Sequence, residues 1–342
     1  MKAFAIGIFI FLTTLSFAQE RSAGFSFIGR RTQTIEPTSP QVLAQKITAS
    51  YKTDLEKVRS IFRWITENIE YNVIVFNKFV RHTPGRYVQA DDDDTSTVLK
   101  PLDERVAEGV LKRKTAVCDG YARLFKTLCN YAGIKAEVIT GYARTGAGRT
   151  GEKFRSNHTW NAVYIDSSWH LLDATWASGY VTWGDQFVKQ YNDYYYLTPP
   201  KQFLQDHYPE DIKWTLLNNT PTLREFQFAP FKHSAFVKYK ITSYSPQSGL
   251  IEASAGDTIL LELETVDAEK AGAVNTELPF ESADFIQTSN SVFVSPSATL
   301  NSKKVNYFYI VDSPLIEWLH VVLSGDVIMR YKLKIRESIV AK

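Results

Sequence analysis

Residues 114–122 read KTAVCDGYA, and this stretch decides how the rest of the chain is interpreted. Further along, residues 157–163 read NHTWNAV and residues 169–176 read WHLLDATW. A cysteine, a histidine and an aspartate are what a thiol nucleophile, its base and the group that orients the base require. We therefore take Cys118, His158 and Asp173 as candidate catalytic residues.

Cys118 is expected at the start of a helix. Apolar residues follow it at helical spacing, and Gly133 suits the position just after the helix end. The helix dipole and the N–H groups of a first turn favour a thiolate, lower the pKa of a cysteine there, and can bind an oxyanion. Cys129 lies among the apolar positions, which predicts a small core residue.

Both cysteines are predicted to be free thiols. In one helix, Cys118 and Cys129 are 129 − 118 = 11 residues apart. At about 1.5 Å per residue, their Cα atoms would be roughly 16 Å apart. A disulfide requires Cα atoms within roughly 7 Å, so this pair cannot form one.

Residues 158–165 and 169–176 are aromatic and β-branched runs on either side of a short polar turn, which predicts a β-hairpin. A turn centred on Asp166-Ser167 pairs residues whose numbers sum to 333. His158 then faces Thr175, and Asp173 is its diagonal neighbour at about 7–8 Å. Shifting the turn by one residue either way keeps His158 and Asp173 on one face, so the register stays open.

Four other histidines are weaker candidates. His170 alternates onto the opposite face from Asp173, and His82, His233 and His320 have no partner motif. The chain lacks the clustered Cys and His spacing of a zinc site, so we predict no metal and no cofactor. Residues 91–94 are four acids without the alternating pattern of a calcium loop, which favours a solvated surface loop.

The remaining elements of this region follow from local signals. Residues 143–156 are rich in Gly and Arg, and are either a lid whose arginines attract acidic groups or a plain connector. The oxyanion-hole partner stays open, with Gln89 as one guess. The other predicted elements are a helix from Ser39-Pro40, a capping box at Thr53–Glu56 that opens a helix, a strand over 71–80, a short helix capped by Asp103 through Lys112, and a strand over 136–142.

The chain beyond residue 230 changes character. The runs 236–242, 258–265, 305–311, 316–323 and 327–335 are typical of strands separated by polar turns. They predict an antiparallel β-sandwich with a supporting or interaction role. The fold class is therefore α+β, with a signal peptide over 1–18, an enzyme domain over 19–230 and a β-sandwich over 231–342.

Composition and the first residues limit the function further. The formal net charge is +2, so nucleic-acid binding has no electrostatic support. Lys2, an apolar run and Ser16-Phe17-Ala18 are typical of a cleaved signal peptide, too short to span a bilayer. We therefore expect a periplasmic or secreted protein, without stable membrane insertion, whose substrates are peptides or proteins and include cell-envelope material.

Together, these motifs resemble the transglutaminase-like superfamily, in its kyphoscoliosis-peptidase-like branch. The resemblance spans about residues 50 to 220 and includes HYPED at 207–211 with Trp214. It implies a papain-like arrangement in which a helix carrying the nucleophile Cys118 packs on an antiparallel sheet bearing the base His158 and its orienter Asp173. The chain departs from the pattern at Ala116, where many relatives have glycine, and at Asp166-Ser167, which replaces a common Asp-Gly turn.

The prediction is a cysteine peptidase or amidase that forms an acyl-enzyme at Cys118. Two alternatives stay open. One is a cross-linking transglutaminase, in which an amine rather than water releases the acyl group. The other is a non-catalytic binding or scaffolding protein that retains the fold.

Overall fold

The computed structural model describes residues 39–75, 100–144, 155–182, 184–266, 290–296 and 304–336. These form two compact units, the first of residues up to 141, 157–203 and 209–216, and the second of residues 142–156, 204–208 and from 217 onward. In the described ranges, no helix is both long and apolar enough to span a membrane. The predicted signal peptide, His82, Gln89, the acidic run 91–94 and residues 145–154 of the Gly- and Arg-rich stretch lie outside these ranges.

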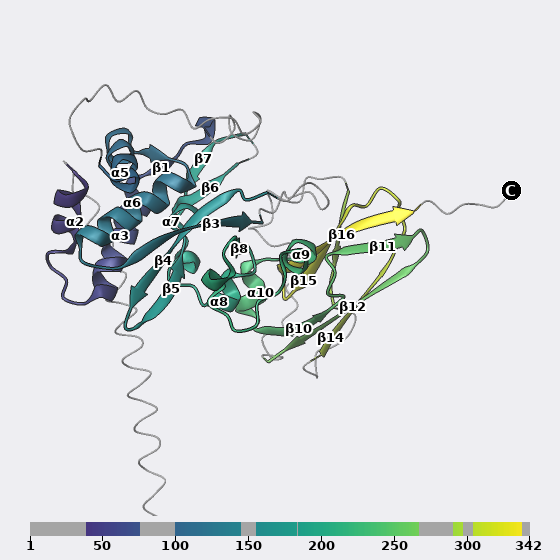
Figure 1. Cartoon of the computed structure of the whole chain (residues 1–342). Helices are drawn as coiled ribbons and strands as arrows, with labels where there is room; N and C mark the ends of the chain where they lie inside the picture. Colours follow the sequence, from purple (N-terminus) through teal and green to yellow (C-terminus); the bar gives the residue numbers. More distant parts are fainter. Residues whose placement is uncertain are drawn as a thin grey trace, which may run out of the picture. The chain divides into compact units, whose positions relative to one another are not determined.

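Four helices form one layer of the first unit (Figure 1): α2 (Pro40–Thr48), α3 (Asp54–Asn68), α5 (Leu102–Arg113) and α6 (Cys118–Tyr131). The predicted helix starts are confirmed at Ser39, whose side chain caps α2, and at Thr53, which forms a capping box with Glu56. The prediction that Asp103 caps α5 is wrong. Pro101 is the N-cap, and Asp103 instead forms ion pairs with side chains of α6.

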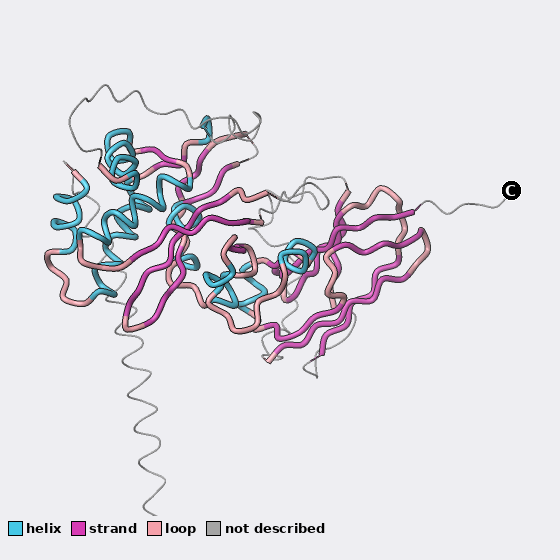
Figure 2. Tube along the Cα trace, in the orientation of Figure 1, coloured by secondary structure: helices cyan, strands magenta, loops and turns pink. Residues whose placement is uncertain are grey.

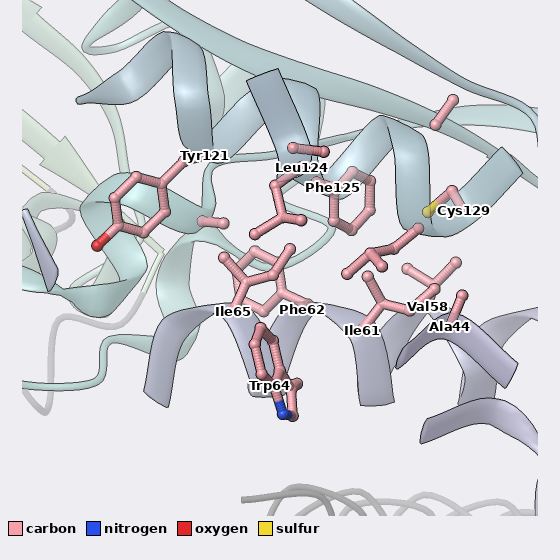
Figure 3. Packing of buried hydrophobic residues seen from close by; sticks show 14 of the residues in the cluster. Ala44, Val58, Ile61, Phe62, Trp64, Ile65, Tyr121, Leu124, Phe125 and Cys129 are labelled. Atoms are coloured by element: carbon pink, nitrogen blue, oxygen red, sulfur yellow. The ribbon is translucent and has the colours of Figure 1, made fainter. Parts of the chain in front are cut away.

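The core of the first unit lies between α3 and α6 (Figure 3). Ile61, Phe62 and Ile65 of α3 pack against Leu124 and Phe125 of α6, and all five are fully buried. Full burial of each such side chain stabilises the fold by about 1.5–3 kcal/mol. In both helices, the buried face is therefore the one that helical periodicity predicts. This packing fixes α6 against α3.

A four-stranded sheet forms the other layer, in the order β5-β4-β3-β8. Its strands are β3 (Ala136–Ala143), β4 (His158–Ile165), β5 (Ser168–Leu172) and β8 (His207–Pro209). The predicted hairpin is confirmed, and of the registers left open the structure has the one with the turn centred on Asp166-Ser167, because Ile165 pairs with Ser168 and Asn161 with Leu172. Asp166 and Ser167 have φ values of 48° and 63°, as a tight two-residue hairpin turn requires.

Short segments complete the first unit. β1 (Glu70–Tyr71) pairs in parallel with β2 (Thr115–Ala116), and β6 (Gly179–Val181) pairs with β7 (Phe187–Lys189). The strand predicted over 71–80 is wrong for residues 72–75, because the chain turns into a helical segment at 73–75, and residues 76–80 lie outside the described ranges. The remaining elements are α7 (Ala174–Ser178), η1 (Asp193–Tyr195), α8 (Pro200–Phe203) and η2 (Ile212–Thr215).

The second unit is rich in strands (Figure 2). One sheet has the order β10-β12-β14, and the other has the order β11-β16-β15-β13, with β9 also paired to β16. Their buried faces share one core, as the sandwich prediction required. The strands are β9 (Phe231–Lys232), β10 (Ile241–Ser245), β11 (Leu250–Ser254), β12 (Thr258–Thr265), β13 (Ser291–Val294), β14 (Lys304–Ile310), β15 (Trp318–Leu323) and β16 (Asp326–Arg336).

Two details of the sandwich prediction are wrong. The pairs β11–β16 and β13–β15 are parallel, so the second sheet is mixed rather than antiparallel. The strand predicted over 236–242 is wrong for its first five residues, because α10 covers Ser234–Lys238, a turn follows, and β10 begins only at Ile241. Phe236 and Tyr239 are three residues apart and both buried, so helical spacing decides this segment. A further helix, α9, covers Leu223–Phe228.

Two histidines without a sequence motif are structural parts of the second unit. His233 is the N-cap residue of α10, and His320 stacks on Phe293 with ring centroids 4.7 Å apart. Burial, together with the charge of Arg330, lowers the pKa of His233 to about 3 and that of His320 to about 4. Both are therefore neutral in the folded protein at ordinary pH.

Candidate active site

Cys118 is the first residue of α6 and is half-buried. Val117 at the N-cap provides no side-chain hydrogen bond, so no side chain caps the first turn of this helix. The N–H groups at a helix start carry partial positive charge and favour a nearby anion. The predicted nucleophile therefore lies where a thiolate and a developing oxyanion are both stabilised.

His158 begins β4 and is buried. Its Nε2 lies 2.7 Å from Oδ2 of Asp173. Asp173 follows β5 directly and is the N-cap residue of α7, where its Oδ1 accepts hydrogen bonds from the backbone N–H groups of Thr175 at 2.7 Å and Trp176 at 3.1 Å. One carboxylate oxygen thus fixes Asp173 to the start of α7, and the other binds the imidazole.

The imidazole joins the carboxylate to the thiol. An ionised carboxylate only accepts hydrogen bonds, so Nε2 of His158 donates to Asp173 and Nδ1 is the nitrogen that remains for Cys118. The side chains of His158 and Cys118 are hydrogen-bonded. Burial lowers the pKa of His158, but the charge and hydrogen bond of Asp173, with the contact to Cys118, outweigh it and raise this pKa to about 10. The site therefore favours an imidazolium beside the sulfur.

Neighbouring side chains hold the imidazole and the nucleophile helix in place. The rings of Trp160 and Trp176 lie 6.0 and 5.3 Å from the ring of His158, centroid to centroid. Asn161, three residues along β4, donates through Nδ2 to the carbonyl oxygens of Ala122 at 2.9 Å and of Glu137 at 3.0 Å. Because Ala122 belongs to α6, Asn161 ties the nucleophile helix to the strand that carries His158.

A groove of about 460 Å³ lies beside β1 and β7 in the first unit. Tyr71, Thr115 and Phe187 line it, along with Glu70, Asn72, Val73, Ile74, Gln186 and Lys189. Tyr71 of this groove is also within range of the charges of Cys118 and Asp173, which after burial raise the pKa of its phenol. Sequence reasoning missed Tyr71.

The structure brings the three predicted residues together from separate elements of the first unit. His158 Nε2 contacts Asp173, and His158, Asp173 and His207 each offer a potential ligand atom within 4.8 Å of the other two, so these three side chains could also hold a metal ion. Cys129 is free and fully buried, and burial raises its pKa well above the usual value, as expected for an inert core thiol. His170, which was set aside, contacts Ser168 instead, with Nε2 2.9 Å from the hydroxyl oxygen.

Residues 41–174 match the family model described as the transglutaminase-like superfamily. The chain is 35% identical over 214 residues to kyphoscoliosis peptidase of Mus musculus, which covers 61% of the chain and 29% of that protein. It is 33% identical over 211 residues to hillarin of Drosophila melanogaster, and this match covers 58% of the chain and 23% of hillarin. Cytokinesis protein 3 of Saccharomyces cerevisiae is 26% identical over 167 residues, and this match covers 47% of the chain and 16% of that protein. The chain thus spans less than a third of the length of these relatives.

The predicted periplasmic or secreted location is wrong. The relatives of the transglutaminase-like region include a protein named for cytokinesis, which is an event of the cell interior. Residues 1–18, on which the prediction rested, lie outside the described ranges. A charged residue followed by an apolar run is a general pattern, and it carries less weight than these relatives.

Proposed function

Because the chain contains a transglutaminase-like domain, we propose that it is a thiol acyl-transfer enzyme acting on peptide or side-chain amides. The observation that carries this proposal is the hydrogen-bonded series from Cys118 through His158 to Asp173. Nucleophile, base and orienter need these contacts in this order. The domain boundaries at 18/19 and 230/231 and the substrate class remain part of the proposal.

The reaction follows from the protonation of the site. The Cys118 thiolate attacks the amide carbonyl carbon, a C–S bond forms, and the carbonyl π electrons move to oxygen. The N–H groups at the start of α6 stabilise this oxyanion. When the oxyanion collapses, the C–N bond breaks, and the imidazolium of His158 gives its proton to the leaving nitrogen, which yields a thioester and a neutral imidazole. Asp173 keeps the proton-bearing Nε2 oriented throughout.

Hydrolysis is the fate that we propose for the thioester. Neutral His158 takes a proton from a water molecule, the resulting hydroxide attacks the thioester carbon, and the acid and free thiol leave. A relative that is 35% identical is named a peptidase, which supports water as the acceptor. In the cross-linking alternative, a primary amine replaces water and the product is a new amide.

Acylation by p-nitrophenyl acetate tests the proposal. The full chain should release one p-nitrophenolate per chain in a burst, and peptide mass spectrometry should find the acetyl group on Cys118. Cys118→Ser should abolish the burst, whereas Cys129→Ser should leave it unchanged, because Cys129 is buried and not ionised. If the folded wild-type chain acquires no acetyl group at Cys118, the enzyme proposal fails and the scaffolding alternative replaces it.

An added amine separates the two acceptors. With monodansylcadaverine present, a hydrolase should still release mainly acetate, whereas a cross-linking enzyme should release mainly the acetylated amine. Predominance of the amide product at millimolar amine would overturn the hydrolytic assignment while leaving the thiol acyl-transfer mechanism in place.

A further inference from the structure

Tyr71 lies in β1, the two-residue strand that pairs in parallel with β2. The register places Tyr71 opposite Ala116, two residues before Cys118. The backbone N–H of Asn72 donates to the carbonyl oxygen of Ala116 at 2.9 Å, and that of Glu70 donates to Lys114 at the same distance. Hydrogen bonds on both sides of Tyr71 thus fix its backbone to the segment that leads into the nucleophile.

A second contact fixes β1 to the nucleophile helix itself. The hydroxyl of Tyr121, in the first turn of α6, donates to the carbonyl oxygen of Ile69 at 2.8 Å. Ile69 directly precedes β1, so this hydrogen bond joins the first turn of α6 to the start of β1. The ring of Tyr71 packs against that of Phe187 with centroids 6.2 Å apart, which restricts the direction of its side chain.

The phenol of Tyr71 lies close enough to Cys118 and Asp173 for both charges to act on it. Burial first, and then these two charges, raise its pKa. The hydroxyl therefore keeps its proton at any working pH and remains a hydrogen-bond donor. Tyr71 also lines the groove of about 460 Å³ beside β1 and β7, together with Thr115 of the segment that leads into Cys118.

We propose that Tyr71 is a catalytic residue whose phenol donates a hydrogen bond to the acyl oxygen of the tetrahedral intermediate at Cys118. This inference rests on the proposed function. When the thiolate adds to the carbonyl carbon, the negative charge that develops on oxygen accepts hydrogen bonds from the Tyr71 hydroxyl and from the start of α6. No proton is transferred from Tyr71, and the charge returns to the C=O bond as the leaving nitrogen takes its proton from His158.

Two reactions of the Cys118 sulfur distinguish a catalytic role of Tyr71 from a structural one. Acetylation by p-nitrophenyl acetate passes through an oxyanion, whereas alkylation by iodoacetamide displaces iodide and forms none. Tyr71→Phe keeps the ring and removes only the hydroxyl. We expect its acetylation rate at Cys118 to fall at least tenfold, since loss of one oxyanion donor costs about 10²–10³ in other enzymes. Its alkylation rate should stay within about twofold of wild type.

Tyr180→Phe is the matched control, because Tyr180 lies in the neighbouring strand β6 and is 44% exposed. Both of its rates should equal those of wild type. The inference is overturned if Tyr71→Phe acetylates within about threefold of wild type, or if acetylation and alkylation fall by the same factor. A wild-type chain that is alkylated but never acetylated at Cys118 would instead contradict the proposed function itself.

Discussion

Asp173→Asn tests the charge at the centre of the candidate site. Asparagine has nearly the same shape as aspartate, so it leaves no cavity, but it has one acceptor oxygen instead of two. Asp173 uses one oxygen to cap α7 and the other to bind His158. If the amide oxygen keeps the cap, the NH2 group faces Nε2 of His158, and the imidazole must carry its proton on Nδ1. That tautomer cannot accept a proton from Cys118.

The magnitude follows from the pKa of His158. The difference between about 10 and the ordinary 6.5 corresponds to roughly 5 kcal/mol of preference for the imidazolium. Without the carboxylate charge, burial is opposed only by the contact with Cys118, so the imidazole loses most of its preference for the proton. A thiol with an ordinary pKa of about 8.5 is only about 3% ionised at pH 7. The alkylation rate of Cys118 at pH 7 is therefore expected to fall by up to about 30-fold.

Iodoacetamide alkylation against pH measures this effect, with the peptides of Cys118 and Cys129 quantified separately by mass spectrometry. Asp103→Asn is the matched control, because Asp103 of α5 pairs with Arg123 of the nucleophile helix α6 rather than with the imidazole. It should alkylate within about threefold of wild type. If Asp173→Asn also keeps the wild-type rate at pH 7, the carboxylate does not maintain the imidazolium and the reasoning is refuted.

The unfolding free energy measured with urea should also report the interaction between His158 and Asp173. The folded pKa of His158 lies above the unfolded value, so the pair stabilises the folded state fully below pH 6.5. This contribution is lost as pH rises toward 10. The difference in unfolding free energy between wild type and Asp173→Asn should therefore shrink over that interval, and a difference that grows would contradict the assignment.

Three further predictions concern stability, each measured by urea denaturation. Asn161→Leu should lower the unfolding free energy by about 1–3 kcal/mol, because two buried carbonyl groups lose their donor. Gly120→Ala should also lower the unfolding free energy, because the new Cβ would lie 2.7 Å from the Cβ of Ala116. Overpacking of this kind costs about 1–3 kcal/mol, whereas the gain in helix propensity is about 1 kcal/mol. Adding Ala116→Gly should recover most of the lost stability. The unfolding free energy of the second unit should fall as pH drops from 6.5 toward 4, because His233 and His320 bind protons only on unfolding. His320→Gln should reduce the dependence of this free energy on pH. An unchanged pH dependence would contradict the role of His320.

Local patterns were enough to predict most of the first unit. Helical periodicity and the capping residues Ser39 and Thr53 located α2 and α3, and two aromatic and β-branched runs around a short polar turn predicted the hairpin, although its register stayed open. Ala116, where the family resemblance leads us to expect glycine, is compatible with the fold because its φ is not positive. Its methyl group lies against Gly120, so the small residue that this contact requires is supplied from the helix side.

The errors have physical reasons. A short apolar run with aromatic residues fits a strand or a buried helical turn equally well, so residues 236–242 were assigned to the wrong element. The parallel pairs β11–β16 and β13–β15 depend on contacts between distant segments, which no local pattern encodes. Asp173 was placed as a paired strand residue, but it leaves the strand and caps α7. The sequence DAT at 173–175 contains the signal, since aspartate is a favoured N-cap residue.

The geometry of the candidate site depends on residues that have no chemical role of their own. Cys118, His158 and Asp173 each come from a recognisable motif, but their contacts depend on the sheet register and on the position of α6 above the sheet. A slip of the hairpin by one residue would turn one of its strands over, and Asn161 would then no longer reach Ala122. Tyr71 enters the site by the same kind of long-range constraint, through the pairing of β1 with β2. The hairpin turn, Asn161 and the β1–β2 pairing therefore set the distances that the three motif residues need, and substitutions there should change reactivity at Cys118 without touching its partners.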